Sequence, residues 1–171
     1  MAGFINATLG TDNPASDSEV RCGRALAALL PAKHTVVLLP PSGHRGALGG
    51  TGATADFIVY SGGSVQSVPG TLKDIQETHN YTITIDAYTP EGYNAAGSVK
   101  AVRDKLSTQA TAVIVDLVNL GNDKNRNEVI TKIITMVDKD FKGRMVVFHY
   151  QNASRVYNPV ASFADTGDNF I

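Results

Sequence analysis

A run of β-branched residues at positions 82–85 is followed by Asp86, Tyr88, Thr89 and then Pro90. β-Branched side chains favour extended backbone, and proline cannot continue a ladder of hydrogen bonds, so a strand must end at this point. Because side chains alternate along a strand, Asp86 and Tyr88 are expected on one face. The sequence therefore predicts a strand end that carries a carboxylate beside a phenol, although a solvated edge followed by a turn is the plain alternative.

Hydrophobic patterning places further elements on both sides of this strand. Helices are predicted over residues 16–30, 71–79, 98–109 and 127–141. Buried strands are predicted over residues 35–39, 55–60, 112–118 and 145–150. The predicted fold class is α+β, a single compact domain in which an N-terminal helix and further helices pack against a twisted mixed or antiparallel central sheet.

The same patterning predicts the organisation of the chain. Residues 1–15 are expected to be an N-terminal extension and residues 16–150 the folded domain. The stretch 151–171 is rich in Asn, Asp, Ser and Gly without clear periodicity, which predicts a loop-like tail.

Composition excludes several classes of protein. A chain of 171 residues with 43% hydrophobic content can bury a core, and its net charge of −1 argues against coating nucleic acid by bulk charge. One cysteine rules out a disulfide framework or a cysteine metal site. No apolar run reaches membrane-spanning length and the first residues lack a secretory pattern, so we expect no signal peptide in this segment and no stable membrane association.

A glycine-rich loop at residues 42–52 could bring backbone amides close to a phosphate. It has neither the Walker pattern nor the dinucleotide fingerprint. His44 and Arg45 near its start pair a titratable base with a fixed cation, a combination that suits a phosphodiester. The alternative is a surface loop with two solvated side chains.

Three carboxylates suggest a metal site: Glu19 on the first predicted helix, and Asp56 and Asp86 on two strands. Metal-dependent nucleases use a similar set that ends in E-x-K or D-x-K, but here the last element is Asp-Ala-Tyr, without the lysine. Glu19 also has a structural explanation, because Ser16 three residues before it completes a capping box. A divalent-metal nuclease is therefore the runner-up hypothesis.

Metal-free cleavage of RNA needs a base, an acid and groups that stabilise the charged phosphorane. His149 ends the last predicted strand, while Thr89, Ser98 and Lys100 flank the loop after the strand at 82–85. These residue types at adjacent strand ends would suffice for the reaction, although a histidine at a strand end is more often structural.

Together these segments resemble the C-terminal toxin domains of contact-dependent growth inhibition proteins. The resemblance rests on the Ser16-x-x-Glu19 helix start and on the segments 35–40, 55–57, 85–90, 98–100 and 109–117. Within that group the chain is similar to the tRNase domains of the barnase, EndoU, colicin and RelE-like superfamily, over residues 16–150.

This resemblance implies a compact nuclease toxin that needs no metal or other cofactor and cleaves tRNA. It implies a domain of a secreted or cell-surface bacterial protein that acts in the cytoplasm of a target cell and is neutralised by a cognate immunity protein. Asp86, Tyr88 and Thr89 would correspond to the strand-end cluster, and Ser98, Lys100 and Gln109 to polar positions of the next helix.

Many relatives in that superfamily have E-x-K where this chain has Asp86-Ala87-Tyr88, so Lys100, Lys105 or His149 would have to supply the missing cation. The roles expected from the resemblance are catalysis by His149, Tyr88, Thr89, Lys100 and Asp86, and substrate binding by His44, Arg45, Ser98 and Gln109. Two alternatives stay open: the divalent-metal nuclease acting on DNA or tRNA, and a non-catalytic interaction domain on a nuclease-like fold.

Overall fold

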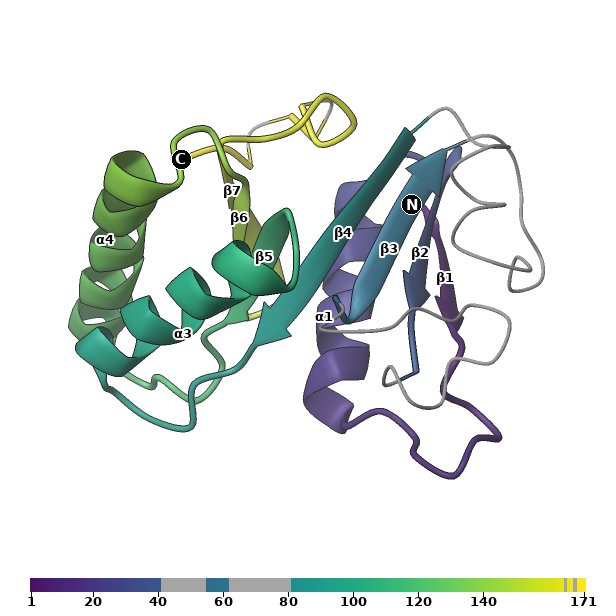
Figure 1. Ribbon diagram of the computed structural model, residues 1–171, viewed down its shortest axis with the longest axis horizontal. Helices are drawn as coiled ribbons and strands as arrows, with labels where there is room; N and C mark the ends of the chain where they lie inside the picture. The colour runs from purple at the N-terminus through teal and green to yellow at the C-terminus, as the bar shows by residue number, and fades with distance from the viewer. Residues whose placement is uncertain (41–54, 62–80, 165, 168) are drawn as a thin grey trace. The chain divides into compact units, whose positions relative to one another are not determined.

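The computed structural model describes residues 1–40, 55–61, 81–164, 166–167 and 169–171 (Figure 1). The glycine-rich loop and the short helix predicted at 71–79 lie outside these residues. The described chain forms two compact units, Met1–Ile85 and Asp86–Ile171. Both combine helices with strands of mixed direction, so the predicted α+β class with helices packed on a mixed sheet is confirmed.

In the first unit, one helix packs on the strands that flank it in sequence. The helix α1 (Asp17–Leu29) contacts β1 (Gly3–Asn6) and β2 (His34–Leu38). β2 runs parallel to β1 and antiparallel to β3 (Phe57–Ser61), which is antiparallel to β4 (Tyr81–Tyr88). The N-cap at Ser16 is confirmed, since Ser16 Oγ accepts a hydrogen bond from the Glu19 amide; the Glu19 carboxylate accepts one from the same hydroxyl at 2.9 Å.

The second unit continues from the end of β4 in an alternating order. It contains α3 (Ala95–Thr108), β5 (Ala112–Asp116), α4 (Asp123–Asp140), β6 (Val146–Tyr150) and β7 (Ala153–Tyr157). β5 and β6 are parallel with α4 between them in sequence, and β7 returns antiparallel to β6. The two helices pack against each other (Figure 1).

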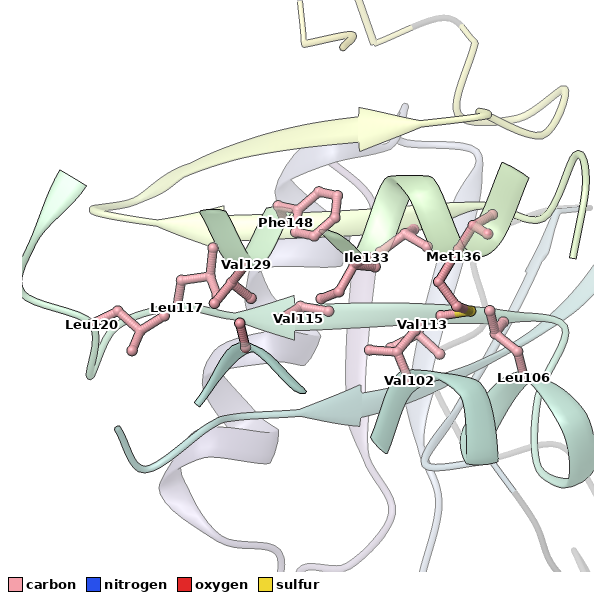
Figure 2. Close-up of a cluster of buried hydrophobic side chains, with 13 residues drawn as sticks. Val102, Leu106, Val113, Val115, Leu117, Leu120, Val129, Ile133, Met136 and Phe148 are labelled. Atoms are coloured by element: carbon pink, nitrogen blue, oxygen red, sulfur yellow. The ribbon is translucent and has the colours of Figure 1, made fainter. Parts of the chain in front are cut away.

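Buried side chains from four of these elements form the core of the second unit. Figure 2 shows Val102 and Leu106 from α3 and Ile133 from α4 meeting Val113 and Val115 of β5. These positions recur at helical spacing on α3 and α4 and at alternate positions on β5, as the sequence predicts.

Both helices begin a few residues earlier than predicted. An asparagine precedes each one: the side chain of Asn94 accepts a hydrogen bond from the Gly97 amide at 2.9 Å, and that of Asn122 from the Asn125 amide at 3.2 Å. These caps satisfy amides that the first helical turn leaves unpaired. In α4 the first apolar residue, Val129, therefore marks the inner face of the helix and not its start.

The loop-like tail predicted for residues 151–171 is wrong over β7. Gln151 and Asn152 have φ of 51° and 62° and form a two-residue turn, which pairs Tyr150 with Ala153. Beyond β7, the Val156 amide donates to Asn169 O at 2.7 Å, so the last residues lie along the strand. Side chains along β7 alternate between exposed and buried positions, as in a strand with one buried face. The strand was missed because it is short and because the turn before it contains no glycine, the usual sequence sign of a hairpin. At the other end, β1 pairs with β2, so Gly3–Asn6 belong to the first unit and not to a separate extension. The boundary predicted at residue 150 for the domain stays a prediction.

Candidate functional site

The predicted strand-end carboxylate does have a lysine partner, and it comes from the next helix. Asp86 is 2% exposed, and Lys105 of α3 donates a hydrogen bond from Nζ to Asp86 Oδ2 at 2.8 Å. This ammonium compensates a charge that could not be buried alone. Of the three candidate cations named from the sequence, Lys105 is the one at Asp86.

The phenol two residues later faces the same helix. Tyr88 Oη lies 3.5 Å from Ser98 Oγ, and the Ser98 side chain is buried. Asp86 and Tyr88 therefore share a face of β4, as predicted. The contacts Asp86–Lys105 and Tyr88–Ser98 together hold α3 on β4. Since Asp86 is buried, only Tyr88 of these two strand residues reaches an open surface.

That surface is a hollow of about 500 Å³ after the end of β4, which we call the tyrosine hollow. Thr89 contributes to it, as predicted for the strand end. The residues that line it are Tyr88, Thr89, Pro90, Glu91, Gly92, Tyr93 and Asn94. It lies at the N-terminal end of α3, where Asn94 is the cap.

Two other predicted residues of this group lie elsewhere on α3. The Lys100 side chain is 75% exposed and pairs with Asp104 at 2.7 Å along the outer surface of the helix. Gln109 ends α3, about 16 Å along the axis from Ser98 at the helical rise per residue. The structure therefore does not bring Lys100 or Gln109 to the tyrosine hollow.

His149 is a buried residue of the sheet. Its Nδ1 lies 2.9 Å from Ser154 Oγ on β7, and its partner in register on β5 is Asp116, which is also buried. Alternation on β6 places His149 on the face opposite Phe148, which belongs to the core beneath the helices. This environment matches the structural role that the sequence left open for His149.

The remaining predicted residues do not add to the site. His44 and Arg45 lie outside the described residues. Glu19 is bonded to Ser16 as the cap of α1, and within the described ranges no three His, Cys, Asp or Glu side chains are grouped so that they could hold a metal ion. The carboxylate set of Glu19, Asp56 and Asp86 is therefore not gathered.

The structure shows a second pocket that sequence reasoning missed, where β5 and β6 end. We call it the arginine pocket; its volume is about 360 Å³. Its lining residues are Leu117, Asp123, Arg126, Asn127, Ile130, Phe148, Tyr150, Gln151, Ala153 and Arg155. In sheets with parallel strands, ligands bind at the carboxyl ends of the strands, beside the first turn of the following helix.

Arg126 is held rigidly at the wall of this pocket. Its guanidinium lies 3.6 Å from the centre of the Tyr150 ring, donates to Leu120 O and forms an ion pair with Asp123. A guanidinium over an aromatic face is stabilised by the ring quadrupole. The contacts fix both the cation and the ring before any ligand binds.

Arg155 supplies a second guanidinium to the lining of the arginine pocket. It is exposed on β7 and forms no ion pair with any residue that the structure describes. The pocket therefore combines one fixed cation, one cation available to a ligand and one phenol. A signal existed in the sequence, since Arg126 lies between a predicted strand at 112–118 and the helix predicted at 127–141, and Tyr150 ends another predicted strand.

Comparisons with protein families, with curated proteins and with solved structures give no match to this chain. Within the part of the chain that the structure describes, no helix has the length and apolar character needed to cross a membrane.

Proposed function

We propose that this chain is a metal-independent endoribonuclease that cleaves tRNA and binds the scissile phosphate in the arginine pocket. The observation that carries the proposal is the meeting of Arg126, Arg155 and Tyr150 at the carboxyl ends of β5 and β6. Guanidinium groups match the geometry of phosphate oxygens, and an aromatic face can stack on a nucleobase.

The charges of the pocket suit a phosphodiester. Asp123 would repel a phosphate, but its carboxylate is paired with Arg126. Arg155 keeps its full charge for the ligand because no described carboxylate pairs with it. Asn127 and Gln151 add amide groups that can bond to sugar or base oxygens.

The reaction is a transphosphorylation. The 2′-oxygen of the RNA gives its proton to a solvent water and bonds to phosphorus, while the bond from phosphorus to the 5′-oxygen breaks and that oxygen gains a proton. Arg155 would stabilise the negative charge of the phosphorane, as preorganised cations do in phosphoryl transfer. Tyr150, whose hydroxyl accepts a hydrogen bond from Gln151 Nε2 at 2.9 Å, is the pocket group placed to give the proton to the 5′-oxygen.

The test is incubation of the purified chain with total tRNA in EDTA, with products resolved on a denaturing gel. We expect discrete fragments that end in a 2′,3′-cyclic phosphate. Arg155→Gln should slow cleavage about 100-fold, the effect of removing one charge-stabilising group, and Tyr150→Phe should slow it by a similar factor. Arg103→Gln, on the exposed outer surface of α3, is the matched control and should cleave like the wild type.

The outcomes separate the hypotheses. Cleavage that is equal in Arg155→Gln and wild type would overturn the assignment of the pocket. Cleavage of DNA or tRNA that EDTA abolishes would favour the divalent-metal nuclease. We also propose that the activity is toxic in a bacterial cytoplasm and is blocked by a cognate immunity protein, as the resemblance implies; growth arrest on expression of the wild type but not of Arg155→Gln would support this role.

A non-catalytic interaction domain is the second candidate. It is favoured by the lining of the arginine pocket, in which there is no histidine among the described residues. Histidine is the most frequent acid or base in enzymes, so a pocket without it can bind a phosphate and leave it intact. Binding of tRNA without cleavage by the wild type would support this candidate.

A further inference from the structure

We infer that the tyrosine hollow is a nucleobase-stacking subsite for the RNA strand whose phosphate lies in the arginine pocket. This inference rests on the proposed function and names the part of the substrate that the second opening would take. It assigns Tyr93 as the stacking residue.

Tyr93 is an exposed aromatic side chain that is nevertheless fixed. It is 47% exposed, and its hydroxyl donates a hydrogen bond to Glu128 of α4. Glu128 is itself held by Lys132 at 3.2 Å. A ring that is already oriented loses little conformational freedom when a ligand stacks on it, which favours binding.

The floor of the hollow is also held in place. The Pro90 side chain is buried, and Pro90 O accepts a hydrogen bond from Asn119 Nδ2 at 3.2 Å. Tyr88 provides a second ring, whose hydroxyl lies 3.5 Å from Ser98 Oγ. The volume of about 500 Å³ is within the range of pockets that hold small molecules.

The charge of the hollow selects a base over a phosphate. Its lining includes Glu91 and contains no lysine or arginine among the described residues. A phosphate would meet a carboxylate without a compensating cation, whereas an uncharged base presents a π-face to the rings. The two openings of this unit therefore suit different parts of one nucleotide chain.

Helix α4 lies between the two openings. Asp123, Arg126 and Asn127 line the arginine pocket, while Glu128 bonds to Tyr93 on the other side of the helix. Residues 126 and 128 differ by about 200° around an α-helix, and a helix with its side chains is about 10 Å wide. A short single-stranded segment can span that width.

Binding of a fluorescein-labelled oligoribonucleotide to the full chain tests the inference. The probe carries 2′-O-methyl groups so that it cannot be cleaved, and a second probe has an abasic residue at each position in turn. Tyr93→Leu should weaken binding of the complete probe about tenfold, as expected for the loss of one stacked base. Tyr93→Phe keeps the ring and should lose much less affinity for the probe. When the abasic residue is at the position that stacks on Tyr93, Tyr93→Leu and wild type should bind the probe equally.

Tyr157→Leu is the matched control, because Tyr157 also donates a hydrogen bond to a carboxylate, Asp138, but lines neither opening. It should bind the probe like the wild type. If Arg155→Gln weakens binding and Tyr93→Leu does not, the subsite is overturned while the proposed function stands. If the wild type binds no probe, both are overturned.

Discussion

Two lysines on one helix show how burial decides the role of a charged residue. Lys105 and Lys100 both pair with an aspartate within 2.8 Å. The Lys105 pair is buried at its carboxylate, since Asp86 is 2% exposed, whereas the Lys100 pair lies in solvent, since the Lys100 side chain is 75% exposed. Breaking a buried pair leaves a desolvated charge, whereas an exposed pair is replaced by water. The sequence shows two similar lysines and cannot show this difference.

Lys105→Met should therefore lower the free energy of unfolding by about 3 kcal/mol, because Asp86 loses its ammonium partner. Lys100→Met should lower it by less than about 0.5 kcal/mol. Urea unfolding monitored by circular dichroism at neutral pH measures both. Equal effects of the two substitutions would contradict the structural role of the Asp86 pair.

The hydrogen bond between Tyr93 and Glu128 predicts a specific pH dependence. Because the Glu128 carboxylate accepts a hydrogen bond from the Tyr93 hydroxyl, the pKa of Tyr93 is raised above its ordinary value, and the pKa of Glu128 is lowered, first by Tyr93 and then by Lys132. The raised tyrosine pKa gives stabilisation that is complete below about pH 10 and is lost as the pH rises through the folded value. The lowered glutamate pKa gives stabilisation that is present at neutral pH and is lost in acid.

Ultraviolet titration of the phenols measures this coupling. Glu128→Gln should lower the pKa of Tyr93 toward that of an ordinary tyrosine, since the charged acceptor is removed. Asp138→Asn is the control, because it should act on Tyr157, whose pKa is raised by its own hydrogen bond to Asp138. An unchanged titration curve in Glu128→Gln would show that the bond is absent in solution.

At the scale of the elements, the sequence predicted those features that depend on residues close together in the chain. The N-cap at Ser16 and the inner residues Val102 and Leu106 of α3 were readable, because caps and helical spacing depend on neighbours in sequence. The Lys105 partner of Asp86 could only be named as one of three cations, since the choice depends on how α3 lies on β4. The arginine pocket was missed because Arg126, Tyr150 and Arg155 come from three different elements, α4, β6 and β7.

The close approach of α1 and β1 depends on a glycine. A Cβ atom on Gly23 would lie 2.4 Å from Phe4 Cε2 and 3.0 Å from Phe57 Cε1. Gly23→Ala should therefore destabilise the protein by about 1 to 2 kcal/mol, the cost of overpacking reduced by the better helix propensity of alanine. Thermal unfolding measures the change.

A second substitution tests the cause. Phe4→Leu removes the ring atoms that the new methyl group meets, so it should cost less stability in the Gly23→Ala background than in the wild type. A purely additive double variant would show that the clash with Phe4 is not the reason.

At the scale of the whole molecule, the near-neutral charge limits how RNA can be bound. A net charge of −1 provides no general attraction for a polyanion, so binding must come from a few placed groups. Because Arg126 is paired with Asp123 and Arg155 is the cation available to a phosphate, log K against log salt concentration should have a slope of about −0.7 for single-stranded RNA. Fluorescence anisotropy across a salt series gives the slope, and a value several times steeper would reveal a basic surface elsewhere.

The two-residue turn at Gln151 and Asn152 makes this site unusually sensitive to chain length. Since successive side chains of β7 alternate between faces, one residue inserted in the turn would send Arg155 into the buried face and Ser154 toward the pocket. The binding group would be lost without any change in residue type. For protein engineering, this hairpin is therefore the wrong place for an inserted tag or label, even though it lies on the surface.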